Sequence, residues 1–280
     1  MASGRSRKPG YAGHMAKAAG GLGDAARRVD VILVMLDARA PGVCFEPFAG
    51  LGTLSQRKSS TLIMLGRDDL ADPEATAKWL EKFRNDGYAA VSVNSKDRGS
   101  VKSALRTAVA LRAPSRKKIY SPRAMLLGVP NTGKSTFINT AAGSRKARVA
   151  DTAGVTRGEQ WVSADGIELL DMPGILDPGK VGPESTLLLG CIGAFSDADL
   201  DAGEAANLIF EKTGTERFLS AYGISPEGIE DCAGAIEALA ERNGMILRGG
   251  EPDVERAALT AVRDYRKLRF GRISLEEPDD

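Results

Sequence analysis

Long apolar runs are missing from this sequence of 280 residues, and the longest, Val31–Leu36, is far too short to cross a bilayer. The basic residues near the N-terminus (Arg5, Arg7 and Lys8) are not followed by an apolar stretch, which argues against a secretory signal. Cysteine is scarce: the three cysteines are widely spaced without a C-x-x-C pair, which argues against a disulfide framework and a structural zinc site. We therefore expect a cytoplasmic protein with reduced thiols and no membrane contact.

Charge of one sign is not in excess overall, since the formal net charge is +1 at pH 7, but it is unevenly distributed. Residues 1–183 contain 28 Lys or Arg against 17 Asp or Glu, whereas residues 184–280 contain 10 against 20. A basic half joined to an acidic half is typical of a protein with a polyanionic partner. Two solvated domains that attract each other would show the same asymmetry, and charge alone does not separate these alternatives.

Strand-like and helical segments alternate before residue 183. Short apolar runs predict strands at Val29–Leu36, Thr61–Leu65, Ala89–Val93, Met125–Gly128, Trp161–Ala164 and Ile167–Leu170. The last two flank Asp165-Gly166, a dipeptide that favours a two-residue hairpin turn. Helices are predicted at Asp72–Gly87 and Gly99–Leu111. This alternation predicts an α/β fold with a mostly parallel sheet.

The pattern changes after Gly182. No strand-like alternation occurs in the acidic residues 184–216, and apolar residues recur at helical spacing in Ile229–Leu239 and Ala257–Leu268. We therefore predict two domains: an α/β domain with a basic N-terminal segment over residues 1–183, and an all-helical domain over residues 184–280.

A phosphate-binding loop is predicted at Gly128–Ser135, which matches G-x-x-x-x-G-K-[ST] without a gap. It follows a predicted strand and opens a predicted helix, Lys134–Ala142, so that main-chain N–H groups converge on a phosphate. Lys134 is expected to reach the β- and γ-phosphates, and the Ser135 hydroxyl to join the Mg²⁺ shell. The residues assigned to phosphate are Pro130, Asn131, Thr132, Gly133, Lys134, Ser135, Thr136 and, downstream, Gly174.

Two further segments are predicted to surround Mg²⁺ and the γ-phosphate. Asp171-Met172-Pro173-Gly174 follows a predicted strand, so Asp171 can hold a Mg²⁺-bound water and the Gly174 amide can meet the γ-phosphate. Thr156 lies between this segment and the phosphate-binding loop and is a candidate second hydroxyl for Mg²⁺. Together with Ser135, these residues predict Mg²⁺-dependent hydrolysis of a nucleoside triphosphate, with loops in residues 144–180 that order around the γ-phosphate.

A segment that reads the nucleotide base is expected upstream of the phosphate-binding loop. A GTP-binding protein normally has N-K-x-D at a strand end, and nothing after Gly174 fits. Gly66-Arg67-Asp68-Asp69 follows the second predicted strand, and Asn94-Ser95-Lys96 follows the third. The residues assigned to the base are Gly66, Arg67, Asp69, Asn94 and Ser95. The base-reading segments therefore precede the phosphate loop, which is a circular permutation of the ordinary GTPase order.

This arrangement resembles the circularly permuted GTPases, and specifically the ribosome biogenesis GTPase A family. The resemblance spans nearly the whole chain and rests on six short segments in the same order. These are Gly13–Ala18, Asp37-Ala38-Arg39, Gly128–Ser135, Gly154-Val155-Thr156, Asp171–Gly174 and Lys267–Arg272.

The resemblance implies a GTPase that binds GTP and GDP, associates with the large ribosomal subunit late in its assembly, and hydrolyses GTP faster when bound to it. The family has an apolar residue, here Ile175, in place of the catalytic glutamine, and His14 matches a histidine proposed to replace it. Asn131 matches an asparagine with which related GTPases bind a potassium ion near the β- and γ-phosphates. The catalytic residues implied are therefore His14, Lys134 and Asn131, with Mg²⁺ and K⁺ as cofactors.

The base-reading segment departs from the family pattern. Gly66 stands where asparagine is expected and Arg67 replaces lysine, whereas Asp69 can still accept two hydrogen bonds from guanine. Arg67 can lay its aliphatic stem over the base as lysine does. We therefore expect reduced guanine affinity or selectivity.

A basic cluster near the C-terminus is a candidate RNA-binding site. Its cations are Arg263, Arg266, Lys267, Arg269 and Arg272. Tyr265 and Phe270 lie among them and could stack on a base. A helix end that uses cations to offset its dipole, with the aromatic rings in the core, is the alternative.

The sequence thus predicts a monomeric GTPase that assists assembly of the large ribosomal subunit. A nucleotide-sensing RNA-binding scaffold with little turnover, or a P-loop ATPase with relaxed base choice, are the alternatives that the unusual base-reading segment leaves open.

Overall fold

The computed structural model describes residues 22–112, 121–143, 160–174, 176 and 181–278. Its first part is built on a six-stranded sheet with the strand order β3-β2-β1-β4-β6-β5. The strands are β1 (Val31–Asp37), β2 (Thr61–Gly66), β3 (Ala89–Val93), β4 (Arg123–Leu127), β5 (Gln160–Ala164) and β6 (Ile167–Asp171). All neighbouring strands are parallel except β5 and β6. The predicted α/β fold with a mostly parallel sheet is confirmed.

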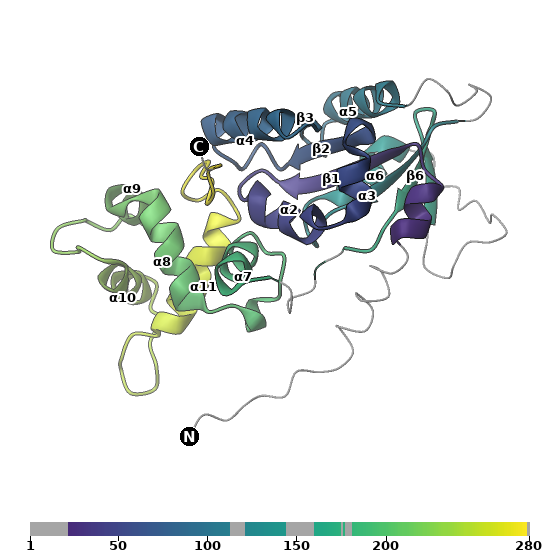
Figure 1. Cartoon of the computed structure of the whole chain (residues 1–280). Helices are drawn as coiled ribbons and strands as arrows, with labels where there is room; N and C mark the ends of the chain where they lie inside the picture. The colour runs from purple at the N-terminus through teal and green to yellow at the C-terminus, as the bar shows by residue number, and fades with distance from the viewer. Residues whose placement is uncertain (1–21, 113–120, 144–159, 175, 177–180, 279–280) are drawn as a thin grey trace.

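Helices cover both faces of this sheet (Figure 1). They are α2 (Pro41–Ala49), α3 (Gly52–Gln56), α4 (Pro73–Asn85), α5 (Arg98–Ala110) and α6 (Lys134–Ala142), with a short 3-10 turn, η1 (Lys58–Ser60), before β2. Side chains of β1 alternate between two apolar clusters, since Val34 packs with α2–α4 and Leu33 packs with α5 and α6. The sheet is therefore buried on both faces, which explains why its central strands are continuously apolar.

Local signals placed the element ends to within a few residues. Asp72 caps α4 by accepting hydrogen bonds from the main-chain N–H groups of Glu74 and Ala75. Asp165 and Gly166 both have positive φ (42° and 84°), as the predicted two-residue hairpin between β5 and β6 requires.

The second part is helical and lies to one side of the sheet (Figure 1). It contains α7 (Pro183–Cys191), η2 (Asp197–Asp199), α8 (Ala202–Thr213), α9 (Thr215–Ser220), α10 (Cys232–Arg242) and α11 (Val254–Tyr265). Helices α10 and α11 each begin three residues away from the predicted start, because Asp231 and Asp253 cap them. None of the described helices is long and apolar enough to cross a membrane. The three cysteines are buried and free of disulfides.

After α11 the chain returns to the first part, and we call residues 271–278 the C-terminal strap (Figure 1). The Glu276 carboxylate accepts hydrogen bonds from the N–H groups of Gly42 (2.8 Å) and Val43 (3.2 Å), in the first turn of α2. The Leu275 N–H donates to the Arg39 carbonyl at 2.8 Å. One apolar cluster also runs through both parts, and it includes Leu65 of β2. The helical part is therefore packed on the sheet domain and also tied to it through the main chain.

Candidate functional site

The predicted phosphate-binding loop joins β4 to α6 and has the backbone that its glycines allow. Gly128 has a φ of +155°, and a Cβ at this position would lie 2.4 Å from the Met35 carbonyl oxygen. Gly133 has a φ of +100° at the N-cap of α6. Asn131 has a φ of +62°, an uncommon conformation for a residue with a side chain. The loop is thus a tight turn in front of a helix N-terminus, a geometry that binds phosphate.

Lys134 is folded back over this loop. Its Nζ donates hydrogen bonds to the carbonyls of Gly128 (2.9 Å) and Val129 (2.7 Å). Burial lowers the pKa of Lys134 to about 8, although the nearby Asp171 carboxylate opposes this effect. The buried amine is therefore held by neutral carbonyls and is available to an incoming anion.

Asp171 and Gly174 lie beside the phosphate loop, as predicted. Asp171 ends β6 and pairs in register with Leu126 of β4. A Cβ on Gly174 would lie 3.1 Å from the Pro130 ring and main-chain nitrogen, so the two loops are in contact. Burial raises the pKa of Asp171, and the charge of Lys134 opposes this rise.

The oxygen ligands that Mg²⁺ prefers are available here. The Ser135 hydroxyl is exposed in the first turn of α6, and the Asp171 carboxylate lies near the neighbouring Lys134. The described residues contain no group of three or more His, Cys, Asp or Glu that could hold a metal. A Mg²⁺ ion at this point would therefore take its further ligands from water or from phosphate oxygens. The predicted site residues His14 and Thr156, and Ile175, lie outside the described residues.

The predicted base-reading segment lies against the phosphate loop. Gly66 ends β2, and a Cβ on it would lie 3.1 Å from the Thr132 carbonyl oxygen and 2.7 Å from the Met35 sulfur. The space beside Gly66 is therefore filled by Met35, which the sequence did not mark as a site residue. No pattern along the chain relates Met35 to Gly66, because they meet only through the pairing of β1 with β2.

The two base-reading loops come together at the ends of β2 and β3. Lys96 lies 3.9 Å from the Asp69 carboxylate, and the Asn94 side-chain oxygen accepts the N–H of Lys96. The Ser95 hydroxyl is buried and has no hydrogen-bond partner among the described residues. It faces the phosphate loop, since a Cβ on Gly133 would lie 3.4 Å from it. An unpaired buried hydroxyl at this point suits contact with a ligand.

Asp37 and Arg39 form a buried ion pair next to these loops. The Asp37 oxygens accept hydrogen bonds from the Arg39 Nε (2.9 Å) and Nη2 (2.8 Å), and both side chains are 1% exposed. Burial opposes the charge on Arg39, but the Asp37 carboxylate outweighs it and holds the pKa of Arg39 above its ordinary value. Arg67 is 3.9 Å from the same carboxylate, so its guanidinium faces Asp37. The sequence identified Asp37-Ala38-Arg39 as a motif but gave it no role.

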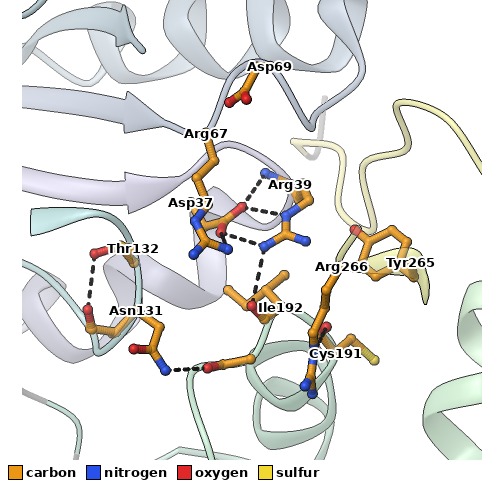
Figure 2. A network of polar contacts seen from close by, with 12 residues as sticks. Asp37, Arg39, Arg67, Asp69, Asn131, Thr132, Cys191, Ile192, Tyr265 and Arg266 are labelled. Atoms are coloured by element: carbon orange, nitrogen blue, oxygen red, sulfur yellow. Dashed lines mark hydrogen bonds and ion pairs between the residues drawn. The ribbon is translucent and has the colours of Figure 1, made fainter. Parts of the chain in front are cut away.

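The end of α7 contacts the phosphate loop, and this contact was not predicted (Figure 2). The Asn131 amide nitrogen donates to the carbonyl of Gly193 at 2.7 Å. The Arg39 Nη2 donates to the neighbouring carbonyl of Ile192 at 3.2 Å. Main-chain carbonyls accept both hydrogen bonds, so no pattern of side chains in the sequence could have predicted these contacts. We call residues 190–193 the α7 turn.

Most cations of the predicted RNA-binding cluster have partners within the chain. Arg263 and Arg266 both pair with Asp197, at 2.8 Å and 2.7 Å, and lower its pKa. Arg269 donates to one main-chain carbonyl, and Arg272 to two. These contacts use guanidinium donors that phosphates would otherwise accept.

The two aromatic residues among these cations are in the core. Tyr265 and Phe270 are each 2% exposed, so neither ring is accessible to an RNA base. The prediction that these rings stack on a base is therefore wrong. Lys267 is exposed. The alternative interpretation, with rings inward and cations near a helix end, describes this segment better.

Comparisons with known proteins agree with the geometry. Residues 123–200 match the model of a family described as "50S ribosome-binding GTPase". The chain is 32% identical to "Ribosome biogenesis GTPase A" of Thermotoga maritima, over 96% of this chain and 94% of that protein. The protein of the same name from Bacillus licheniformis is 30% identical, over 96% and 98% of the two chains.

A solved structure shares the fold. The structure described as GNP-bound YlqF from T. maritima matches with a TM-score of 0.67 and 29% identity, over 94% of this chain and 99% of that one. The GDP-bound structure of the T. maritima YlqF matches with the same TM-score over 92% of this chain. The predicted P-loop GTPase sheet followed by C-terminal helices is confirmed.

Proposed function

This chain belongs to the ribosome biogenesis GTPase A family, and we propose that it hydrolyses GTP with Mg²⁺ while assisting assembly of the large ribosomal subunit. On this proposal it acts in the cytoplasm as a monomer, and its nucleotide state controls its association with the subunit. Residues 1–183 form the GTPase domain, and residues 184–280 form the domain that binds the ribosome and its RNA.

One observation carries this proposal: three segments far apart in the sequence meet at the carboxyl edge of the sheet in the permuted order. Gly66 of the base-reading segment abuts the carbonyl of Thr132, and Gly174 abuts Pro130 from the other side. Lys134 follows the phosphate loop at the start of α6 and is near Asp171. A guanine nucleotide laid across the loop would thus meet the base-reading segment at one end and Asp171 at the other.

Each residue then has a role set by its position. The main-chain N–H groups of residues 131–136 hold the phosphates, and Lys134 exchanges its two carbonyl acceptors for phosphate oxygens. The Asp69 carboxylate accepts hydrogen bonds from guanine, and the Ser95 hydroxyl gains the partner that it lacks.

Cations are proposed to bind at the end of the site near Asp171. Ser135, Asp171 and Thr156 would hold Mg²⁺, which neutralises charge on the β- and γ-phosphates when bound. Gly174 would meet the γ-phosphate, and Asn131 would contribute to a potassium site. His14 would orient the attacking water once the ribosome has delivered it to the site.

Two measurements test this function. Titration of GTP, GDP and ATP against the purified protein should show tighter binding of guanine nucleotides, and tighter binding of ATP would contradict the GTPase proposal. Phosphate release should rise on addition of large ribosomal subunits, more in potassium than in sodium, and should be lost in Lys134→Ala. Guanine binding without any stimulated release would instead support a nucleotide-sensing scaffold. This alternative has to be tested because Met35 fills the space beside Gly66 in the base-reading segment.

A further inference from the structure

The α7 turn is a junction between three segments of the chain. An α-helix leaves its last carbonyls without partners inside the helix, and they carry partial negative charge. Arg266 of the helical part donates to the carbonyls of Gly190 (2.8 Å) and Cys191 (3.0 Å). The next two carbonyls accept from the sheet domain, one from Arg39 and one from Asn131. Four consecutive carbonyls are therefore held by three side chains: Arg266 of the helical part holds two of them, and Arg39 and Asn131 of the sheet domain hold one each.

We propose that the α7 turn positions the phosphate-binding loop through Asn131, so that the helical part and the nucleotide affect each other across this contact. The proposal rests on the proposed function only in taking the loop to bind a guanine nucleotide. Asn131 is a positioning residue in this role, because it acts on the shape of the loop through its own main chain.

The backbone of Asn131 explains why an external contact matters. Its φ of +62° lies in the left-handed region, which asparagine adopts more readily than most residues but which still costs more than the right-handed region. The hydrogen bond to the Gly193 carbonyl holds the side chain in place from outside the loop. Moving the α7 turn therefore loosens the conformation that receives the phosphates.

Arg39 is held in place at this junction by Asp37 and still has one donor nitrogen without a hydrogen bond. Its Nε and Nη2 are bound to Asp37, and Nη2 also reaches Ile192. Its Nη1 is buried and has no hydrogen-bond partner among the described residues. A shifted α7 turn could place another carbonyl against Nη1, so the junction has the donors for two arrangements. Elements with two arrangements are what couple distant sites.

The chain offers a matched pair of glycines to test this coupling. Helices α7 and α10 end in the same motif, with Gly193 (φ +85°) and Gly244 (φ +62°) after the last turn and the following N–H bonded back to Leu189 or Ala240. Alanine at either position disfavours the same left-handed conformation. At Gly193 its Cβ would also contact the Arg266 side chain, whose Nε lies 3.4 Å away. No contact joins Gly244 to the phosphate loop among the described residues.

The experiment measures binding of fluorescent GDP and of a non-hydrolysable GTP analogue to Gly193→Ala and Gly244→Ala. Both variants should lose similar thermal stability. Gly193→Ala should weaken nucleotide binding about fivefold or more, the lower end of usual allosteric couplings, whereas Gly244→Ala should stay within about twofold of the wild type. Equal nucleotide affinity of the two variants would overturn the proposal.

A second background shows whether Asn131 carries the effect. Asn131→Gly keeps the positive φ accessible but removes the hydrogen bond to Gly193. In that background Gly193→Ala should cause no further loss of affinity, because the two changes break the same contact. An undiminished effect of Gly193→Ala would show that the coupling does not pass through Asn131 and would overturn the assignment.

Hydrogen exchange gives a readout in the opposite direction. Coupling between two sites is reciprocal, so nucleotide should slow amide exchange at residues 189–194 in the wild type and in Gly244→Ala, but not in Asn131→Gly. Unchanged exchange in nucleotide-saturated wild type would contradict the proposal. A wild type that binds no guanine nucleotide would instead overturn the proposed function, so the two failures are distinguishable.

Discussion

The sulfur of Met35 fills the space beside Gly66 that any side chain at residue 66 would need. A Cβ on Gly66 would lie 2.7 Å from this sulfur, and 3.1 Å from the carbonyl of Thr132 on the other side. At Gly66 the base-reading segment therefore lies directly against the main chain of the phosphate loop. The glycine at this position has a large neighbour, and the Met35 side chain would have to shift to admit a side chain at residue 66.

The expected asparagine at residue 66 should be tolerated only after Met35 is made smaller. Gly66→Asn alone should destabilise the protein by about 1–3 kcal/mol, because it overfills a closely packed site. Gly66→Asn combined with Met35→Ala should recover part of that loss and raise the preference for GTP over ATP. Urea unfolding and nucleotide titration check the two effects, with Met35→Ala as the control. A combined variant with unchanged preference would show that residue 66 does not set base selectivity.

Nucleotide affinity should fall with pH above about 8. The Lys134 pKa of about 8 in the free protein means that the amine loses its proton there, whereas bound phosphate favours the charged form. Binding therefore takes up a proton in this range, and affinity for GDP should drop by up to about tenfold per pH unit. Calorimetry in buffers of different ionisation enthalpy measures the uptake. Lys134→Met should bind weakly and show no such dependence.

The same pKa has an opposite effect on the stability of the free protein. The unfolded chain keeps the lysine proton up to its ordinary pKa of 10.5, whereas the folded protein releases it near 8. The unfolded state thus binds more protons between these values, so the contribution of Lys134 to folding stability rises with pH. Unfolding free energies at pH 7.5 and 9.5, compared with those of Lys134→Met, should show this rise, and an equal slope in both proteins would contradict it.

Breaking the Asp37–Arg39 pair should be among the more damaging single changes outside the apolar core. Each partner is 1% exposed, so Arg39→Met leaves a buried carboxylate with only the more distant Arg67 to offset it. We expect a loss of about 3–5 kcal/mol in the free energy of unfolding, measured in urea. The double variant Asp37→Asn with Arg39→Met should lose less than the sum of the single changes. Full additivity would mean that the two side chains do not act as a pair.

Glu276 and Glu277 form a natural pair of test and control. The Glu276 carboxylate caps the first turn of α2 by accepting hydrogen bonds from the N–H groups of Gly42 and Val43. Glu276→Gln removes the charge of this cap and should lower the free energy of unfolding by about 0.5–2 kcal/mol. Glu277→Gln removes only an exposed ion pair with Lys78 and should cost less than about 1 kcal/mol. Equal losses in thermal unfolding would show that the cap on α2 contributes little.

The sequence predicted the sheet and the phosphate loop because their signals are local. The apolar run in β2, the Asp72 cap and the Asp165-Gly166 turn each act within a few residues. The phosphate loop is a contiguous motif, and the place of Gly174 near it was predicted from the Asp171–Gly174 segment that follows a strand.

The remaining features of the site depend on contacts that cross the chain. Asn131 meets Gly193 through a main-chain carbonyl 62 positions away, and any residue type presents that carbonyl. Met35 beside Gly66 depends on the register of two strands. The cations near the C-terminus were instead assigned a role too readily. Their density in the sequence predicted RNA binding, whereas Arg266 donates to the carbonyls at the end of α7.

The C-terminal strap has a consequence for how the molecule comes apart. Because Glu276 is bound to the start of α2, which follows the central strand β1, the helical part cannot detach without exposing the N–H groups of that helix. The shared apolar cluster would be opened in the same step. Two regions that differ in architecture and in sign of charge should therefore melt as one cooperative unit, in a single calorimetric transition.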